Sequence, residues 1–503
     1  MNKTWKIGTR GSLLALTQCQ QTRELLESRS GEKFELVVIK TQGDQQTDKP
    51  LWQLEGKDFF TKELDEALLK NEVDLVVHSY KDLGSERPHG IELAAVVERK
   101  YGHDILLIPK KNIEALKAGT IKELIVGTSS PRRITNLENQ LSSFVPSNPK
   151  VSTKMLRGNV NTRVQKLQDG DYHAIVLAMP GLERLAQGKE SKIELKRLMQ
   201  GLDFMILPAS KFPWAASQGA LAIEMNKDNP KANDLAKILG TVHHKETQEA
   251  VKRERKAFNQ YGGGCHLAVG VAVIASKACF IHSHRGVKDE QSIEELYLEP
   301  APKKVKAVKV FEGMPHHDKL LKKSPTMNIE VDLNDKDVFA TSSNVFEALS
   351  KTNQSRGLWA AGTKTWQKLA SANHWVNGAA DSLGEDQLKE FEKSELLKII
   401  RGSDFNWLVL SAEDASSQLG PVVETYTRET QTTSSEFKRT IEETSDFFWT
   451  SFPQYQTYLE HFPGIHAKRH WCGLGKTYDA FVSAKIDVIP VSGILEFRKM
   501  TQA

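Results

Sequence analysis

The sequence predicts an α/β protein that is divided into several domains. Short apolar runs alternate with longer amphipathic stretches, as where FELVVIK at 34–40 and VDLVVHS at 73–79 flank a helix-like segment at 60–70. Apolar runs of this length are typical of strands buried on both faces of a sheet. At 503 residues the chain is too long for one hydrophobic core, and roughly 100–200 residues per domain predict about three to five domains.

The composition is typical of a soluble globular protein. Hydrophobic residues make up 39% and charged residues 26%, which allows sizeable cores. The net charge of +4, from 68 basic and 64 acidic side chains, is too balanced to favour nucleic acid or a membrane surface as a partner. The amino terminus lacks the apolar segment of a signal peptide, and no apolar run approaches the ~18 residues of a membrane span. We therefore expect a cytoplasmic protein.

Cysteine and histidine spacings predict neither a disulfide framework nor a metal site. The four cysteines show no CxxC spacing: Cys19, Cys265, Cys279 and Cys472. The histidines at 243–244 and 316–317 are adjacent pairs, which cannot easily face one metal from a helix. The GKT segment at 475–477 ends like a phosphate loop, but His470 stands where the Walker pattern requires glycine.

Further strands of the first half end in polar loops. ELIVGTSS at 123–130 and YHAIVLA at 172–178 each run into a loop and then a helical segment. In open α/β sheets, ligands bind beyond the carboxyl ends of the strands. We therefore expect the functional residues on these loops.

The chain beyond the first 300 residues is predicted to be a second unit. Residues 298–330 are rich in Pro and Lys without sustained apolar periodicity, which indicates a linker. After it, FATS at 339–342 and FWTS at 448–451 are each followed by a helix-like stretch and then by a Gly-Thr-Lys or Gly-Lys-Thr segment. This repetition predicts two lobes with related halves.

Arginines cluster on the predicted loops of the first unit. They lie beside Gly, Ser and Thr in IGTRGS, VGTSSPRR and LRGNVNTR: Arg10, Arg132, Arg133, Arg157 and Arg163. Guanidinium groups bind acidic ligands through paired, charge-assisted hydrogen bonds. The GTSS segment also offers backbone donors and hydroxyls at a predicted helix start, which suits carboxylate or phosphate. The alternative is a set of surface arginines that lie near loops.

Two further segments carry reactive groups. VHSYKDL at 77–83 ends a buried strand with Lys81 and Asp82, which suits proton transfer or stabilisation of a cation, although a strand-end cap is equally compatible. Cys265 follows three glycines, which leave its thiol accessible for a covalent adduct. The alternative for Cys265 is a buried, small apolar residue.

These segments together resemble hydroxymethylbilane synthase, also called porphobilinogen deaminase, in the same order and at matching distances. The resemblance runs from residue 7 to about 272 and is carried by IGTRGSLLALTQ, DLVVHSYKDL, VGTSSPRR, LRGNVNTRVQKL, AIVLAMPGLERL and GGGCHLAVG, among other blocks. It implies three α/β domains, of which the first two are hinged like a periplasmic binding protein and the third is a small α+β domain with the cofactor cysteine. The implied boundaries are 1–100 with 202–222, 101–201, and 223–297.

The resemblance also implies the chemistry. Four porphobilinogen units are deaminated in turn and added head to tail to a dipyrromethane cofactor on Cys265, and water then releases linear hydroxymethylbilane. Asp82 holds the position of the catalytic aspartate, which stabilises the cation left by ammonia. The five arginines would hold the acidic side arms, with Ser12, Gln18, Ser79, Lys81, Thr128, Ser129 and Ser130 assisting.

Some positions depart from the family pattern. After Asp82 the usual Val-Pro is Leu83-Gly84, and the usual leucine of GTSSLRR is Pro131. The GKGLF segment reads GKDFF at 56–60, where an extra acid could alter the behaviour of a lid. A noncatalytic binding protein of the same fold is the alternative for this unit, and the presence of Asp82 and Cys265 speaks against it. The sequence leaves the oligomeric state open, and a monomer is compatible with it.

The second unit, residues 331–503, resembles uroporphyrinogen-III synthase, a two-lobed α/β family that cyclises hydroxymethylbilane. FATSSNVFEAL, LWAAGTKTWQKL, WLVLSAEDASSQL, VVETYTRE and FFWTSFPQYQTYL carry this resemblance. The implied site residues face the cleft between the lobes: Thr341, Ser342, Tyr426, Thr450 and Ser451. The family's opening strand is not visible before residue 335, which predicts a shortened first lobe. The alternative is a degenerate scaffold that only docks partners.

Overall fold

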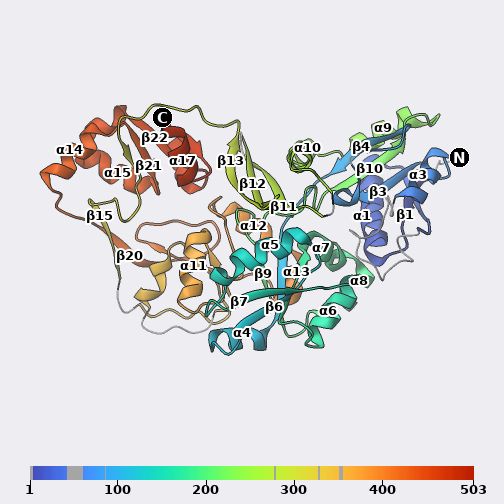
Figure 1. Ribbon diagram of the computed structural model, residues 1–503, viewed down its shortest axis with the longest axis horizontal. Coiled ribbons are helices and arrows are strands. Elements are labelled where there is room, and N and C mark those ends of the chain that lie inside the picture. The colour runs from blue at the N-terminus through green and yellow to red at the C-terminus, as the bar shows by residue number, and fades with distance from the viewer. Residues whose placement is uncertain are drawn as a thin grey trace.

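The computed structural model describes residues 4–41, 61–84, 86–264, 266–276, 279–326, 329–349 and 355–502 (Figure 1). Their strands form five sheets, and helices lie between successive strands in four of these, so the predicted α/β class is confirmed. Figure 1 shows the amino-terminal domain at one end of the molecule and the carboxy-terminal unit at the other. None of the helices within the described ranges is long and apolar enough to cross a membrane.

Domain 1 is built on a five-stranded sheet of order β2-β1-β3-β10-β4. Its strands are β1 (Thr4–Thr9), β2 (Lys33–Val38), β3 (Leu75–Ser79), β4 (Ile91–Val97) and β10 (Leu221–Asn226). Its helices are α1 (Leu13–Ser30), α3 (Lys62–Leu69) and α9 (Ala232–Gly240). β1 is parallel to both neighbours, whereas β10 is antiparallel to β3 and β4. Both parallel neighbours of β1 therefore end at the same edge of the sheet as β1 itself.

Domain 2 repeats this arrangement in a sheet of order β7-β6-β8-β5-β9. Its strands are β5 (Asp104–Pro109), β6 (Glu123–Gly127), β7 (Lys150–Lys154), β8 (Ala174–Ala178) and β9 (Leu202–Ile206). Its helices are α4 (Lys110–Lys117), α5 (Pro131–Gln140), α6 (Val160–Gln168), α7 (Met179–Gln187) and α8 (Lys189–Leu198). β7, β6 and β8 are parallel to one another, and β5, the next strand in the sheet, is antiparallel to β8. The chain passes between the two domains twice, through 98–103 and 207–220.

The expected boundary of the returning segment, 202–222, differs from the structure. Residues 202–206 form β9 and pair with β5, so they belong to domain 2. The segment that returns to domain 1 begins with β10 and includes α9, because Leu235 and Leu239 are buried in the core of domain 1. The boundary was placed too early because β9, an edge strand after α8, runs into the crossing at 207–220 without a turn signal in the sequence.

Domain 3 is a three-stranded antiparallel sheet covered by one long helix. The strands are β11 (Ala268–Ser276), β12 (Cys279–Lys288) and β13 (Gln291–Glu299), and the helix is α10 (Lys245–Gln260). β12 and β13 are joined by Asp289 and Glu290, both with positive φ, as a tight two-residue hairpin turn requires. α10 leads directly into the glycine loop at 262–264.

The carboxy-terminal unit has two lobes, each with its own sheet. The first lobe has the order β15-β20-β19-β16-β17-β18, and the second has β14-β21-β22-β23. The strands of the first lobe are β15 (Leu321–Pro325), β16 (Asp337–Ala340), β17 (Gly357–Ala360), β18 (Gly378–Ala379), β19 (Trp407–Ala412) and β20 (Val422–Thr430). Those of the second are β14 (Val310–Phe311), β21 (Asp446–Trp449), β22 (Arg469–Gly473) and β23 (Ile489–Val491).

Helices follow most of these strands. The first lobe has α11 (Thr363–Ser371), α12 (Asp386–Glu392) and α13 (Glu395–Arg401), and the second has α14 (Ser435–Glu443), α15 (Phe452–His461), α16 (Lys476–Ser483) and α17 (Ile494–Thr501). A 3₁₀ helix at Ser343–Ala348 follows β16, in the place that α15 takes after β21. The two repeated sequence patterns thus fold into related strand–turn–helix units, one in each lobe.

The predicted linker at 298–330 is wrong over part of its length. β14 pairs with β21 in the second lobe, and β15 pairs with β20 in the first. Both are edge strands, and such strands are protected by charges and proline, here Lys322, Lys323 and Pro325. These residues remove the apolar alternation by which a strand is recognised. The first lobe is therefore not shortened in the way expected, since β15 precedes residue 335.

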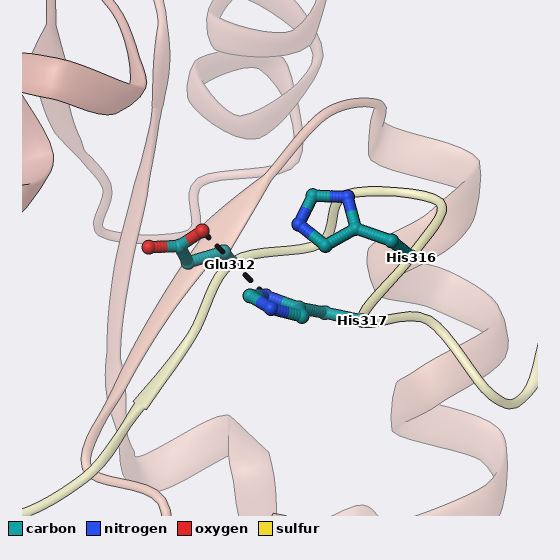
Figure 2. Close-up of side chains that lie close together, drawn as sticks. All are labelled: Glu312, His316 and His317. Carbon is teal, nitrogen blue, oxygen red and sulfur yellow. Dashed lines mark ion pairs between the residues drawn. The ribbon is translucent and has the colours of Figure 1, made fainter.

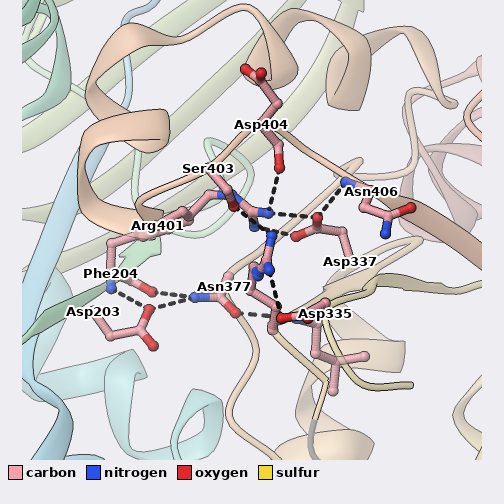
Figure 3. Close-up of polar contacts among 11 residues, drawn as sticks. Asp203, Phe204, Asp335, Asp337, Asn377, Arg401, Ser403, Asp404 and Asn406 are labelled. Atoms are coloured by element: carbon pink, nitrogen blue, oxygen red, sulfur yellow. Dashed lines mark hydrogen bonds and ion pairs between the residues drawn. The ribbon is translucent and has the colours of Figure 1, made fainter. Parts of the chain in front are cut away.

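The first lobe packs on domain 2 through a continuous apolar core. Phe144 of domain 2 contacts Phe212 and Trp366, with ring centroids 5.5 and 5.4 Å apart, and Trp366 Nε1 donates to the Phe144 carbonyl at 3.0 Å. The backbone N–H of Ile206 at the end of β9 donates to the Asn377 carbonyl at 2.8 Å, beside β18. The edges of the two sheets therefore meet. Figure 3 shows the Asn377 side chain directed at Asp203 and Phe204, to which it donates at 2.8 and 2.9 Å.

The second lobe packs on domain 3. Leu474 lies against Ile281 and Leu298, and the N–H of Leu298 donates to Glu496 of α17 at 3.1 Å. The carboxy-terminal unit therefore contacts two different domains of the first unit, one through each lobe.

Candidate active site

A pocket at the carboxyl ends of β1 and β3 contains five of the predicted site residues. Its lining includes Arg10, Ser12, Gln18, Ser79 and Asp82. Arg10 directly follows β1, and Ser79 is the last residue of β3. The parallel pairing of these two strands brings together loops that lie about seventy residues apart in the sequence.

The first turn of α1 fixes one wall of this pocket. Ser12 is the N-cap of α1 and accepts a hydrogen bond from the Ala15 N–H at 3.3 Å. Two turns later, the buried Gln18 donates from Nε2 to Ser79 Oγ at 3.1 Å. This bond ties α1 to the end of β3 and thereby to the segment that carries Lys81 and Asp82.

Lys81 and Asp82 lie on a 3₁₀ turn, Tyr80–Asp82, that continues β3. Both side chains are exposed. The surrounding protein nevertheless desolvates the Lys81 ammonium group, which lowers its pKa, and Asp82 opposes this effect while Arg133 and Arg132 add to it. Since Arg132 and Arg133 belong to domain 2, Lys81 lies within electrostatic range of that domain.

The three hydroxyl residues after β6 are engaged in local bonds. Ser129 Oγ donates to the Leu156 carbonyl at 2.7 Å and accepts from the Leu156 N–H at 3.1 Å. Thr128 Oγ1 accepts from the Ser130 N–H at 3.3 Å, and Ser130 is the N-cap residue of α5, with Pro131 in the first turn. The departure at Pro131 from the family pattern is therefore accommodated by helix geometry.

Arg132 and Arg133 hold a buried carboxylate, Asp104, which the sequence did not indicate. Arg132 donates to Asp104 at 2.8 Å, and Arg133 donates through two nitrogens at 2.7 and 3.0 Å. Burial alone would raise the pKa of Asp104, but the two guanidinium groups, together with a bond from Gln218, hold it well below its usual range. Two cations and one anion leave an excess of positive charge at this wall.

Arg157 and Arg163 extend this positive wall at the start of α6. Burial, together with the charges of Arg133 and Arg157, lowers the pKa of Arg163 to about 10. Arg157 Nη2 is buried and has no hydrogen-bond partner among the described residues. A guanidinium nitrogen in this state is a donor that an acidic ligand would satisfy.

The loop before Cys265 has an unusual backbone. Gly262, Gly263 and Gly264 all have positive φ, at 109°, 62° and 88°. Residues other than glycine rarely have a positive φ, and three in succession would be strained. Cys265 itself lies outside the described residues, as does the GKDFF segment.

One further arginine that the sequence analysis missed lies close to the crossings between domains. Arg184 of α7 donates to the Gly219 carbonyl at 2.5 Å, and burial lowers its pKa to about 10. Arg184 lies in the GLERL sequence at 181–185, one of the blocks that resemble the family, and this block could have identified it as a site candidate.

The five candidates of the carboxy-terminal unit form two groups, one in each lobe. Thr341 follows β16 and donates to the Leu410 carbonyl at 3.0 Å, and Thr450 follows β21 and lies 3.0 Å from Gln454 Oε1. The next residues are Ser342 and Ser451, of which Ser451 is the N-cap of α15. Tyr426 of β20 is buried, with Lys323 Nζ 5.2 Å from its ring centroid.

The two lobes touch at the GKT segment. Lys476 Nζ donates to the Ser416 carbonyl at 2.9 Å and pairs with Glu385, both from the first lobe. A Cβ atom on Gly475 would lie 3.0 Å from the Ser382 carbonyl oxygen. This segment therefore forms a contact between the lobes.

His316 and His317 can face one point in space together, contrary to the expectation from their adjacent positions. Figure 2 shows both side chains beside Glu312, and one potential ligand atom from each residue lies within 4.8 Å of the others. The pair lies in a turn rather than a helix, so its side chains can converge. However, both Glu312 oxygens accept from Arg498 at 2.6 Å, so a guanidinium already balances the carboxylate. We assign no metal to this group.

The fold is that of an α/β protein with two similar domains, in which a pocket of domain 1 is lined by Asp82 and Arg10 and domain 2 carries a cluster of further arginines. Residues 5–234 match the family described as "Porphobilinogen deaminase, dipyromethane cofactor binding domain". A porphobilinogen deaminase of Nostoc sp. is 37% identical over 274 residues, which cover 54% of this chain and 77% of that protein. A probable porphobilinogen deaminase of Methanocella arvoryzae is 39% identical over 266 residues, covering 53% and 78%. The chain belongs to the porphobilinogen deaminase family, and its amino-terminal half carries the dipyrromethane cofactor domain.

Proposed function

We propose that the first three domains polymerise four porphobilinogen units into linear hydroxymethylbilane, on a dipyrromethane cofactor attached to Cys265. The observation that carries the proposal is that Asp82 lines a pocket at the end of β3, while the adjacent Lys81 lies within electrostatic range of Arg132 and Arg133 on domain 2. A noncatalytic binding protein would need the arginines but not an exposed carboxylate at the end of β3.

The positively charged wall matches the substrate. Each porphobilinogen unit carries one acetate and one propionate, so the growing chain is a polyanion. Arg157 and Arg163 would bind these side arms, since Arg157 Nη2 has no hydrogen-bond partner among the described residues and Arg163 is partly desolvated. Arg10 and Ser12 would bind side arms from the domain 1 side of the cleft.

Asp82 would act on the charge that develops when ammonia leaves. Its carboxylate can accept hydrogen bonds from pyrrole N–H groups and stabilise the positive charge on the substrate. Lys81, the adjacent residue, would bind a carboxylate side arm and thereby orient the ring next to Asp82. The bond between Gln18 and Ser79 holds this segment against α1.

Arg132, Arg133 and the hydroxyl residues 128–130 would hold the cofactor. Dipyrromethane, when bound, supplies the pyrrole carbon to which the first substrate unit is joined. Arg132 Nε is buried without a hydrogen-bond partner within the described ranges, so this side chain retains one donor beyond its bonds to Asp104. The thiol of Cys265, which follows the glycine loop at 262–264 in the sequence, would carry the cofactor.

The test uses the purified full chain. Its intact mass is expected to exceed the polypeptide mass by two pyrrole rings, and this increment should disappear in Cys265→Ser. Incubation with porphobilinogen should release ammonia and yield hydroxymethylbilane. Protein that lacks the increment and stays inert with porphobilinogen would overturn the proposal.

For the carboxy-terminal unit we propose uroporphyrinogen-III synthase activity. Two observations support it: the sheet of each lobe is parallel apart from the edge strand β15, and each lobe presents a Thr-Ser pair after one of its strands, at 341–342 and 450–451. Lys323 and Arg428, which are paired across β15 and β20 next to Tyr426, add positive charge suited to an acidic bilane.

A docking scaffold is the second candidate, because the first lobe packs so closely on domain 2 and the hydroxyls of Thr341 and Thr450 already have local partners. The two candidates differ in the isomer produced. Porphobilinogen supplied to the full chain without added synthase should yield the type III isomer if the unit is active. Exclusive formation of uroporphyrinogen I would reject the synthase and favour the scaffold.

A further inference from the structure

α10 of domain 3 reaches across to the turn that carries Asp82. Arg255 Nη2 donates to the Gly84 carbonyl at 2.7 Å, and Nη1 donates to the carbonyls of Leu83 at 3.1 Å and Tyr80 at 3.4 Å. The guanidinium carbon also lies 4.9 Å from the centroid of the Tyr80 ring. The three accepting residues bracket Lys81 and Asp82 on both sides.

We propose that Arg255 is a positioning residue that fixes the Asp82 turn to the helix leading into the cofactor loop; this inference rests on the catalytic role proposed for Asp82. The Tyr80 carbonyl also accepts from the Leu83 N–H at 3.2 Å within the turn, and the carbonyls of Leu83 and Gly84 come directly after it. Arg255 binds all three from outside, because its planar guanidinium group offers several donors at once.

The other end of α10 explains why this contact matters. Arg255 lies five residues before the end of α10, about 7.5 Å along the helix axis. Tyr261 directly follows the last residue of α10, and its hydroxyl lies 2.9 Å from Nδ1 of His284 on β12. The glycine loop begins immediately after Tyr261. One rigid helix therefore links the catalytic turn to the loop before Cys265.

The neighbouring residue, Glu254, anchors α10 at the crossings between domains 1 and 2. It is fully buried and accepts from Arg99 at 2.8 and 2.9 Å, from Trp214 Nε1 at 2.8 Å and from the Ser217 N–H at 2.7 Å. Arg99 belongs to the first crossing, and Trp214 and Ser217 to the second. Glu254 thus fixes α10 to both crossings, and the next residue, Arg255, bonds to the turn that carries Asp82.

The experiment compares Arg255→Ala and Arg255→Lys with Arg253→Ala, which removes another half-buried arginine of the same helix. Arg253 pairs with Glu249 and Glu299 and makes none of the bonds to the Asp82 turn. A misplaced catalytic group can cost about 100-fold in rate, so kcat of Arg255→Ala is expected to fall by about 100-fold. KM for porphobilinogen should change little, since the arginines that bind the side arms are untouched. Arg255→Lys should recover part of the loss, and Arg253→Ala should stay near wild type.

Hydrogen exchange gives a readout that does not depend on turnover. Amides of residues 80–84 should exchange faster in Arg255→Ala than in wild type and in Arg253→Ala. Equal exchange in this segment, together with kcat within twofold of the Arg253→Ala control, would overturn the inference. A wild-type protein that is inert with porphobilinogen would instead reject the proposed function, and the exchange result would still decide whether Arg255 holds the turn.

Discussion

Glu183 of domain 2 accepts a hydrogen bond at 2.5 Å from the hydroxyl of Ser394, which lies in the carboxy-terminal unit more than two hundred residues later. The same carboxylate accepts from the N–H groups of Glu395 and Leu396, at 3.1 and 3.2 Å, and so caps α13 from outside. A helix amino terminus stabilises a negative charge, which allows Glu183 to be buried there. The two halves of the chain thus share one buried polar site in addition to their apolar contact.

Replacing Glu183 should loosen this contact. Glu183→Ala leaves the Ser394 hydroxyl and two N–H groups without their acceptor, and we expect a loss of about 2 kcal/mol in stability. The midpoint of urea unfolding measures it. Glu190→Ala, which removes an exposed glutamate of α8, is the control, and equal midpoints for the two variants would contradict the expectation.

Asp82→Ala should abolish chain elongation. Removing a group that stabilises transition-state charge typically costs about 100- to 1000-fold in kcat. Release of ammonia from porphobilinogen measures the effect, and Glu92→Ala, an exposed residue of β4, serves as the control. Turnover of Asp82→Ala at the wild-type rate would remove Asp82 from the mechanism.

Arg163→Leu should weaken substrate binding. Losing one charge-assisted hydrogen bond costs about 1.5–3 kcal/mol, so KM for porphobilinogen should rise by about 10-fold or more. Arg197→Leu removes an arginine of α8 that pairs with Glu194, and its KM should be unchanged. An unchanged KM in Arg163→Leu would exclude it from the binding wall.

Asp104→Asn should destabilise domain 2, because two buried guanidinium groups lose their counter-charge. Breaking a buried ion pair in this way costs about 3–5 kcal/mol. The pKa of Asp104 is lowered in the folded state, so its contribution to stability is fully present above the ordinary aspartate pKa. That contribution is lost only as the pH falls through the lower, folded-state pKa. Urea unfolding at pH 7 measures the loss, and an Asp104→Asn midpoint equal to wild type would show that the pair adds nothing.

The sequence predicted those strands that can be recognised from their own apolar residues. The apolar runs at 34–40 and 73–79 correspond to β2 and β3. Only β3 is buried on both faces as predicted, whereas β2 is an edge strand on which Val38 is exposed. β14 and β15 were missed because β14 has only two residues and β15 carries two lysines and a proline. Their pairing depends on neighbours more than a hundred residues away.

The residues of the candidate site were predicted individually, but the protein groups that bind some of them were not predicted. Arg132 and Arg133 were expected to face a ligand, whereas Asp104, at the start of β5, binds both. Nothing near Asp104 in the sequence marks it as their acceptor. Arg255 stands in the polar stretch KRERK, which is typical of a solvent-exposed helix face, and only the packing of α10 against domain 1 reveals its role.

The attachment of the carboxy-terminal unit has a consequence for how the cleft opens. Its first lobe packs on domain 2 through Phe144 and Trp366, so these two parts should keep a constant mutual distance during turnover. Domain 1 joins them through the crossings at 98–103 and 207–220, next to Glu254. A growing polypyrrole would then be accommodated by a movement of domain 1 relative to domain 2, with the bonds from Arg255 of domain 3 keeping the Asp82 turn on α10. Fluorophore pairs spanning the cleft should report a change in distance, and pairs between domain 2 and the first lobe should report none.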